Sequence, residues 1–193
     1  LRKSPKFGND DDTVDRLVVE MTDFNDRGLS RYTDVLGQPF HSAIMGLTYN
    51  IPTGAVVGAL PCGRKAGEPL AEGCSPHPGT EVSGPTATMR SEAKVNHELH
   101  PGGTLLNLKI LPSVIEGHRG LAGMAALIRS YFELGGYHCQ FNVIRPETLR
   151  DAQKHPDRYR DLVVRVAGYC AIFTELSKEV QNEIIRRTTH ETL

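Results

Sequence analysis

The chain has 193 residues, 39% of them hydrophobic and 23% charged, which is typical of one globular unit with a hydrophobic core. A formal net charge of −1 argues against nucleic acid or an anionic membrane surface as a partner. No apolar run approaches the roughly 20 residues of a membrane span, and residues 1–20 carry charges throughout, unlike a signal peptide. The four cysteines form no CxxC pair and the eight histidines show no metal-ligand spacing, so reduced thiols, a cytoplasmic location and no metal are expected.

The first half of the chain predicts a helix, two short strands and a loop. Acidic residues at positions 10–12 favour the start of a helix, and apolar residues at helical spacing predict one or two helices over residues 13–35. Residues 42–51 are weakly polar and predict a buried strand that stops at Pro52, and residues 55–60 predict a second. Residues 61–88 are rich in Gly, Pro, Ser and Thr and predict a long surface loop.

In the second half, strand patterns alternate with helix patterns, which indicates the α/β class. Leu149 and Ala152 are expected to face inward from a helix that opens at Pro146. The predicted elements are a strand over 105–110, a helix over 120–134 that ends at two glycines, a strand over 137–144, the helix from Pro146, and a last helix capped by Ser177. His190, near the terminus, is expected to be solvated.

A glycine lies among apolar residues 25 positions before the C-terminus, in the run Arg165-Val166-Ala167-Gly168-Tyr169-Cys170-Ala171. Alone, such a glycine indicates only a turn or a bulge. The apolar residues on both sides predict that Gly168 lies at a buried loop tip. The charge of Arg165 is expected to be used in an ion pair or in hydrogen bonds to the backbone.

Other segments accompany this run in a fixed order: Phe7-Gly8-Asn9-Asp10, Gly84-Pro85-Thr86-Ala87, Gln140–Ile144 and Leu149–Pro156. Together they resemble the glycyl radical enzymes over essentially the whole chain. The resemblance implies the C-terminal part of a ten-stranded α/β barrel, with residues 1–88 in the barrel and 89–193 in the glycyl radical domain. Because Leu1 is not a start methionine and the opening segment is typical of the middle of a protein, we expect a longer polypeptide.

Glycine suits a backbone radical for a physical reason. Loss of one α-hydrogen leaves a carbon radical that the amide nitrogen and the carbonyl stabilise when the α-carbon is planar, and a side chain would clash in that geometry. The resemblance implies that Gly168 carries this radical, that no cofactor is bound, and that a separate activating enzyme with S-adenosylmethionine and an iron–sulfur cluster installs it. It also implies that the radical passes to a catalytic cysteine upstream of this chain.

Two further runs, Arg64–Gly73 and Ser83–Ala87, are most similar to the branch of diol dehydratases and choline trimethylamine-lyase. This implies radical elimination on a small-molecule substrate by a homodimer. Arylacetate decarboxylases and formate acetyltransferase stay open, as do a stand-alone subunit that repairs an oxygen-damaged lyase and an inactive fragment. The segment Leu47, Thr48, Tyr49 and Asn50 matches a barrel-lining strand of the family and is expected to bind substrate. Cys74 is expected to be an inert loop thiol.

Overall fold

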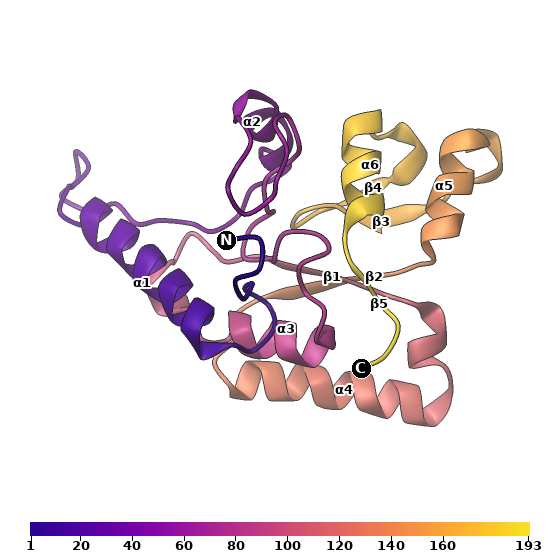
Figure 1. Cartoon of the computed structure of the whole chain (residues 1–193), viewed down its shortest axis with the longest axis horizontal. Coiled ribbons are helices and arrows are strands. Elements are labelled where there is room, and N and C mark those ends of the chain that lie inside the picture. Colours follow the sequence, from indigo (N-terminus) through magenta and orange to yellow (C-terminus); the bar gives the residue numbers. More distant parts are fainter.

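The structure is a computed structural model, and it describes all residues from 1 to 193. Helices and strands alternate along the second half of the chain (Figure 1), as the α/β prediction requires. The helices are α1 (Asp12–Leu29), α2 (Asn50–Val56), α3 (Gly84–Glu92), α4 (Gly117–Glu133), α5 (Pro146–Lys154) and α6 (Lys178–Arg186). The strands are β1 (Leu106–Ile110), β2 (Cys139–Val143), β3 (Val163–Arg165), β4 (Cys170–Ile172) and β5 (Thr189–His190).

A small parallel sheet forms the centre of the molecule, with strand order β2-β1-β5. Its register places Asn107 beside Gln140 and Lys109 beside Asn142. The strands β3 and β4 form a separate antiparallel hairpin, in which Arg165 pairs with Cys170. The order of the elements therefore brings polar residues of two sheet strands onto neighbouring positions.

The two faces of the sheet are covered by different helices, because successive side chains of a strand point to opposite faces. Leu106 and Leu108 pack with Met89 of α3 and with Leu127 and Tyr131 of α4, which lie below the sheet in Figure 1. On the other side, a second cluster joins the hairpin to α5 and α6. Its fully buried members are Leu105, Leu149, Ala152, Val164, Val166, Ala167, Phe173 and Ile184.

A buried lysine attaches α6 to the sheet. The ammonium group of Lys109 donates hydrogen bonds to the carbonyls of Ile184 and Ile185, at 3.2 and 2.8 Å, in the last turn of the helix. A cation is favourable there because the helix dipole is negative at its C-terminal end. At its other end, α6 is capped by the Ser177 hydroxyl, as predicted. The helix is thus fixed at both ends, and the residue after it has a defined position.

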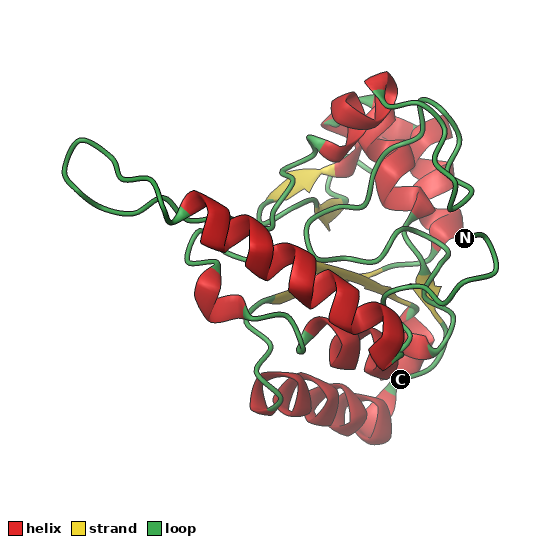
Figure 2. Ribbon diagram, turned by 60° about the vertical axis from the view of Figure 1, so that its left-hand side comes forward, coloured by secondary structure: helices red, strands yellow, loops and turns green.

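The helix α1 turns its polar side inward. Asp15 and Asp26 are buried, and Asp15 accepts hydrogen bonds from Ser91 and Lys94. By contrast, Leu17 is 56%, Met21 72% and Phe24 81% exposed. The loop that follows the helix projects away from the rest of the chain (Figure 2). The predicted helix exists but ends at Leu29, and its apolar stripe is uncovered in this chain.

Both strands predicted in the first half are wrong. Residues 42–51 contain only an isolated bridge at Ile44, and then Leu47 and Thr48 take positive φ angles of 45° and 75°, which turn the chain into α2. Residues 55–60 form the end of α2 and an irregular segment. Short apolar runs predict a buried helix and a buried strand equally well, so tertiary contacts decide. One of these is the close approach of Gly54 to the backbone of Glu68.

The long loop is confirmed over residues 61–83, after which Gly84 begins α3. The predicted strands at 105–110 and 137–144 and the predicted helices at 120–134 and from Pro146 are confirmed. Leu149 and Ala152 are fully buried, as expected. No helix of the chain combines the length and the apolar character that crossing a membrane requires.

Candidate functional site

Gly168 lies in the loop that joins β3 to β4. The Val166 amide donates a hydrogen bond of 2.9 Å to the Tyr169 carbonyl and closes the loop. Gly168 has a φ of +81°, which L residues with a side chain rarely adopt. A Cβ atom placed there would lie 3.4 Å from Leu105 Cδ1, an ordinary contact. The backbone angle, more than a lack of space, therefore favours glycine at this position.

The tip of this loop is not buried in this chain, which corrects the sequence-based prediction. Val166 and Ala167 are fully buried against α5 and α6, whereas Gly168, Tyr169 and Cys170 are exposed. The left-handed turn at Gly168 accounts for the difference, because it directs the chain away from the core after two inward side chains. The apolar neighbours thus anchor the loop without enclosing its tip.

The side chain of Gln140, on β2, binds the tip of this loop through hydrogen bonds. Its Oε1 atom accepts hydrogen bonds from the Gly168 amide at 3.1 Å and from Arg165 Nε at 3.2 Å. Its Nε2 atom donates to Asn107 Oδ1, and Asn107 Nδ2 donates to Glu72 Oε2. A chain of side-chain hydrogen bonds therefore runs from Gly168 through two amides to a buried carboxyl group.

Arg165 does not use its charge as expected. Its guanidinium group contacts the Gln140 carbonyl and the Cys170 sulfur, the latter at 3.3 Å, and forms no ion pair with a carboxylate. Its backbone N–H and carbonyl are both bonded to the Asn142 side chain, at 2.9 and 2.8 Å. Arg165 thus connects the two strands of the hairpin with β2.

Arg187, directly after α6, holds the other side of the loop. Its Nη2 atom donates to the Val166 carbonyl at 2.7 Å and to Glu183 Oε2 at 2.8 Å, and Nε donates to both oxygens of Glu183. Both side chains are buried. A buried ion pair in which most donors and acceptors are satisfied fixes geometry well, so the Val166 carbonyl has a defined position two residues before Gly168.

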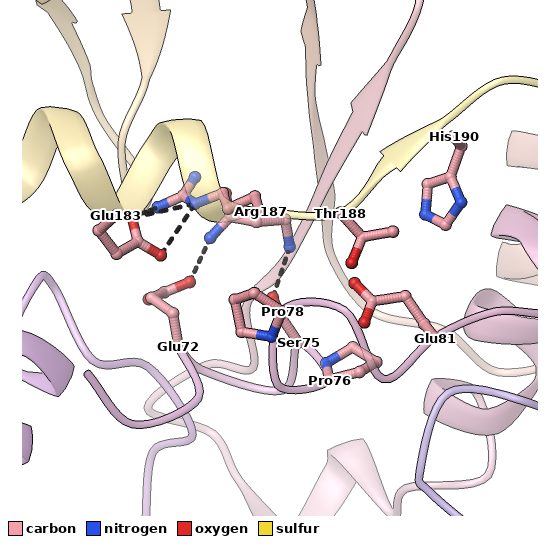
Figure 3. A pocket seen from close by; sticks show the side chains of 10 residues that line it. Glu72, Ser75, Pro76, Pro78, Glu81, Glu183, Arg187, Thr188 and His190 are labelled. Atoms are coloured by element: carbon pink, nitrogen blue, oxygen red, sulfur yellow. Dashed lines mark hydrogen bonds and ion pairs between the residues drawn. The ribbon is translucent and has the colours of Figure 1, made fainter. Parts of the chain in front are cut away.

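A small polar cavity lies beside this ion pair (Figure 3). It measures about 10 Å³, close to the space of one water molecule. Burial raises the pKa of Glu72 to about 7, although Arg187 opposes the shift, and burial also raises the pKa of Glu81. Figure 3 shows these carboxyl groups on the loop segment below α6 and β5. The sequence alone could not connect Glu72 and Glu81 with Gly168, because they lie far from it along the chain and no regular spacing relates them to it.

His190 also lines this cavity and is not solvated, contrary to expectation. It is buried on β5 next to β1, and burial lowers its pKa to about 4. Cys74 is buried as well, and burial raises its thiol pKa, which fits an unreactive thiol. Cys62 and Cys170 are exposed, and Cys139 is half-buried.

The segment predicted to bind substrate begins beside the same cavity. A Cβ atom placed at Gly46 would lie 3.5 Å from Glu72 Oε1, and the chain then turns through Leu47, Thr48 and Tyr49. Leu47 and Tyr49 are exposed, Tyr49 to 73%, whereas Asn50 is buried and donates to the Leu70 carbonyl. These residues form a turn and the start of α2, and of the four only Leu47 and Tyr49 are exposed.

Most of the chain matches two known protein families. The model of the family described as "Glycine radical" matches residues 70–174, more than half of the chain, and "Pyruvate formate lyase-like" matches residues 1–54. The chain belongs to the glycyl radical enzymes. Gly168 and the residues that hold it, apart from Arg187, lie within the first of these two ranges.

Characterised glycyl radical enzymes are similar over nearly the whole chain. Trans-4-hydroxy-L-proline dehydratase of Clostridioides difficile is 44% identical over 96% of this chain, and indoleacetate decarboxylase of Tractidigestivibacter scatoligenes is 44% identical over 98%. The glycerol-bound B12-independent glycerol dehydratase of Clostridium butyricum has a TM-score of 0.96 and 47% identity over 98%. The chain spans 23%, 22% and 24% of the three relatives, about a quarter of a glycyl radical enzyme, and its fold is part of their barrel.

Proposed function

We propose that this chain is the C-terminal part of a glycyl radical enzyme and that Gly168 stores its radical. The observation that supports this most strongly is the position of Gly168. It is a left-handed glycine at the exposed tip of a well-anchored loop, within the range matched by the radical family. A tip that is exposed while the loop behind it is anchored suits a group that must meet a partner.

The proposed chemistry moves one hydrogen atom in each step. An activating enzyme that uses S-adenosylmethionine generates a carbon radical, which takes one hydrogen atom from Gly168 Cα. The Gly168 radical then takes a hydrogen atom from a cysteine thiol, which restores the Cα–H bond and leaves a thiyl radical to attack the substrate. The thiyl radical takes a hydrogen atom from the substrate, and the substrate radical rearranges. The product radical then takes a hydrogen atom from the cysteine thiol, and the resulting thiyl radical takes one from Gly168 Cα, which restores the thiol and the glycine radical. In this cycle, Gly168 is a store of the unpaired electron.

The catalytic thiol is proposed to lie upstream of this chain. Burial raises the pKa of Cys74 and that of Cys139, the latter to about 11, which suits packing better than reaction. Cys170 is exposed, and its sulfur accepts a hydrogen bond from Arg165, on the opposite strand of the hairpin. The exposed face of Gly168 is the side from which an upstream thiol would approach.

The rest of the polypeptide is proposed to cover the exposed apolar residues of α1, because contiguous apolar patches of this kind mark contact surfaces. In this arrangement, residues 1–88 belong to the barrel and residues 89–193 to the radical domain, and the two parts meet within α3. The complete enzyme is proposed to be a homodimer with a small-molecule substrate, for which Leu47–Asn50 contribute part of the site.

The proposed reaction is a radical elimination of water, an amine or a sulfur group from a small substrate. It is supported by the dehydratases among the relatives and by an isethionate sulfite-lyase from Bilophila wadsworthia, 38% identical over 99% of this chain. Decarboxylation of an arylacetate is the second candidate, because the indoleacetate decarboxylase is as similar as the hydroxyproline dehydratase. Residues outside this chain would select between the two.

A substrate panel tests this proposal. The complete polypeptide is activated without oxygen and offered glycerol, trans-4-hydroxy-L-proline, isethionate and indoleacetate, and the products are identified by mass spectrometry. Elimination from one of the first three supports the proposal, whereas release of CO₂ from indoleacetate alone favours the second candidate. A Gly168→Ala variant that is carried through the same activation must be inactive, and turnover by it would contradict the role of Gly168.

A further inference from the structure

The contact between Gln140 and Gly168 assigns a role to a residue outside the glycine loop. We propose that Gln140 is a positioning residue for the radical: its carbonyl oxygen holds the Gly168 amide and stabilises the unpaired electron on the neighbouring Cα. This inference rests on the proposed function of Gly168. It starts from the 3.1 Å hydrogen bond between the Gly168 amide and Gln140 Oε1.

The orientation of the Gln140 amide is fixed by groups that can act in only one way. The Gly168 amide and Arg165 Nε can only donate hydrogen bonds, so the group that faces them must be the Gln140 carbonyl. The Gln140 NH₂ group then donates to Asn107 Oδ1. The two ends of this side chain therefore have different partners, and reversing it would place donors against donors.

The far end of the hydrogen-bond chain imposes the same direction. In its ionised form Glu72 can only accept, which places the NH₂ group of Asn107 toward Glu72 and leaves Asn107 Oδ1 for Gln140. The requirements of Glu72 and of Gly168 thus agree across two intervening amides. If residue 140 only had to be polar and buried, the two ends of the hydrogen-bond chain would not have to set the same direction.

The position of Gln140 is rigid as well as its direction. Gln140, Asn107 and Glu72 are all buried, and Asn107 and Gln140 are register partners on the parallel strands β1 and β2. Hydrogen bonds in such a low-dielectric environment are stronger than in water and reinforce one another. On the other side of the loop, Arg187 fixes the Val166 carbonyl. Gln140 therefore holds the Gly168 amide itself, and Arg187 holds the loop two residues before it.

This contact has a direct effect on the radical. When Gly168 loses a hydrogen atom from Cα, the amide nitrogen donates electron density to the carbon, and the N–H group becomes more positive. An oxygen acceptor on that N–H stabilises the radical more than the parent glycine, and no proton needs to move. The Gln140 carbonyl also keeps the peptide plane before Gly168 in one orientation. Both effects favour removal of the hydrogen atom at this residue.

The test measures the radical of the complete enzyme after activation in Gln140→Leu and Gln140→Glu variants. Leucine removes the acceptor at similar volume, whereas glutamate keeps an oxygen for Gly168 but cannot donate to Asn107. Gln153→Leu is the matched control, because Gln153 bonds only to Asn182 on α6. Electron paramagnetic resonance in H₂O and in D₂O gives the radical yield and the coupling to the exchangeable amide proton of Gly168.

We expect Gln140→Leu to lower the radical yield about tenfold and to change the amide-proton coupling. Gln140→Glu should change the coupling in the opposite direction, because its acceptor is charged, and Gln153→Leu should change neither quantity. The same coupling and yield in Gln140→Leu as in the unsubstituted enzyme would overturn the inference. If Gln140→Leu does not fold, an unchanged coupling in Gln140→Glu would overturn it equally.

These outcomes separate this inference from the proposed function. If the unsubstituted enzyme forms no radical on Gly168, the proposed function is wrong, and the role of Gln140 in radical chemistry falls with it. If the radical forms but its yield and its amide-proton coupling do not change when residue 140 is substituted, only the role of Gln140 is wrong. Hydrogen exchange of the Gly168 amide before activation gives a further readout, and we expect Gln140→Leu to accelerate it about tenfold.

Discussion

The amide nitrogen of Gly168 lies 3.1 Å from Oε1 of Gln140, which is 28 residues earlier in the chain. This bond connects the tip of the hairpin with the central sheet. The loop is not held by its own backbone alone, because Gln140 binds it on one side and Arg187 on the other. The geometry of Gly168 therefore depends on residues that a loop motif does not contain.

Replacing Gly168 by alanine should abolish the radical and cost little stability. The new Cβ meets only Leu105 Cδ1, at 3.4 Å, so the main cost is the positive φ, about 1–2 kcal/mol. Thermal unfolding and electron paramagnetic resonance of the complete enzyme measure the two effects separately.

Gly79→Ala is the matched control for this substitution. Gly79 has a φ of +83°, and a Cβ atom there would meet nothing within 4 Å. The two variants should lose similar stability, but only Gly168→Ala should lose the radical. A radical that survives in Gly168→Ala would assign the unpaired electron to another residue.

Oxygen should cut the activated protein at Gly168. A carbon radical in the backbone adds O₂, and the resulting species breaks the chain at that residue. Mass spectrometry after exposure to air should therefore find a new C-terminal piece that begins at or next to Gly168. A chain that loses its radical in air but remains intact would contradict the assignment, and Gly168→Ala should stay uncut.

Arg187→Leu should destabilise the protein by about 3–5 kcal/mol, because it leaves the carboxylate of Glu183 buried without its partner. The double variant Arg187→Leu/Glu183→Leu removes both charges and should recover part of this loss. It still lacks the donor to the Val166 carbonyl, so its radical yield should stay low. Recovery of both stability and radical yield would show that Arg187 does not position the loop.

Much of the fold could be predicted from the sequence, because the signals for these helices and strands lie within each segment. The strand over residues 105–110 and the helix from Pro146 carry complete patterns of side-chain period and end signals. The strand predicted over residues 42–51 was wrong, because Leu47 and Thr48 adopt left-handed backbone angles. Glycine and asparagine are the residues that usually indicate such angles, and neither stands at these two positions. Their conformation depends on tertiary contacts of the turn.

The site could be predicted only in part. Gly168 was recognisable because its motif is contiguous in sequence. Glu72, Asn107 and Arg187 come together only when the sheet, α6 and the loop before α3 are assembled, and no spacing between them has a period. His190 was misjudged for the same reason, since pairing of β5 with β1 buries a residue close to the terminus.

His190 should make the protein sensitive to acid. Burial lowers its pKa from the usual 6.5 to about 4, so between these values the unfolded chain binds more protons than the folded chain. Stability should therefore fall by up to about 3 kcal/mol as the pH falls from 6.5 to 4. Thermal unfolding of His190→Gln should lose less over this range. Equal losses in both proteins would contradict burial of a neutral imidazole.

Tyr49→Ala in the complete enzyme should change the substrate preference. The Tyr49 side chain is 73% exposed in this chain and is available to face a substrate pocket built by other segments. Activity on a diol, an amino alcohol and an arylacetate should change unequally, by about tenfold if one packed aromatic contact is lost. Unchanged relative activities would remove Tyr49 from the proposed substrate site.

The most direct test of the account is an electron paramagnetic resonance spectrum of the complete, anaerobically activated enzyme, prepared with ordinary glycine and with α-deuterated glycine. A radical on Gly168 Cα keeps one α-hydrogen, so the ordinary sample should give a doublet. The deuterated sample should give a single narrow line. A signal that is the same in both samples would show that the radical is not on a glycine.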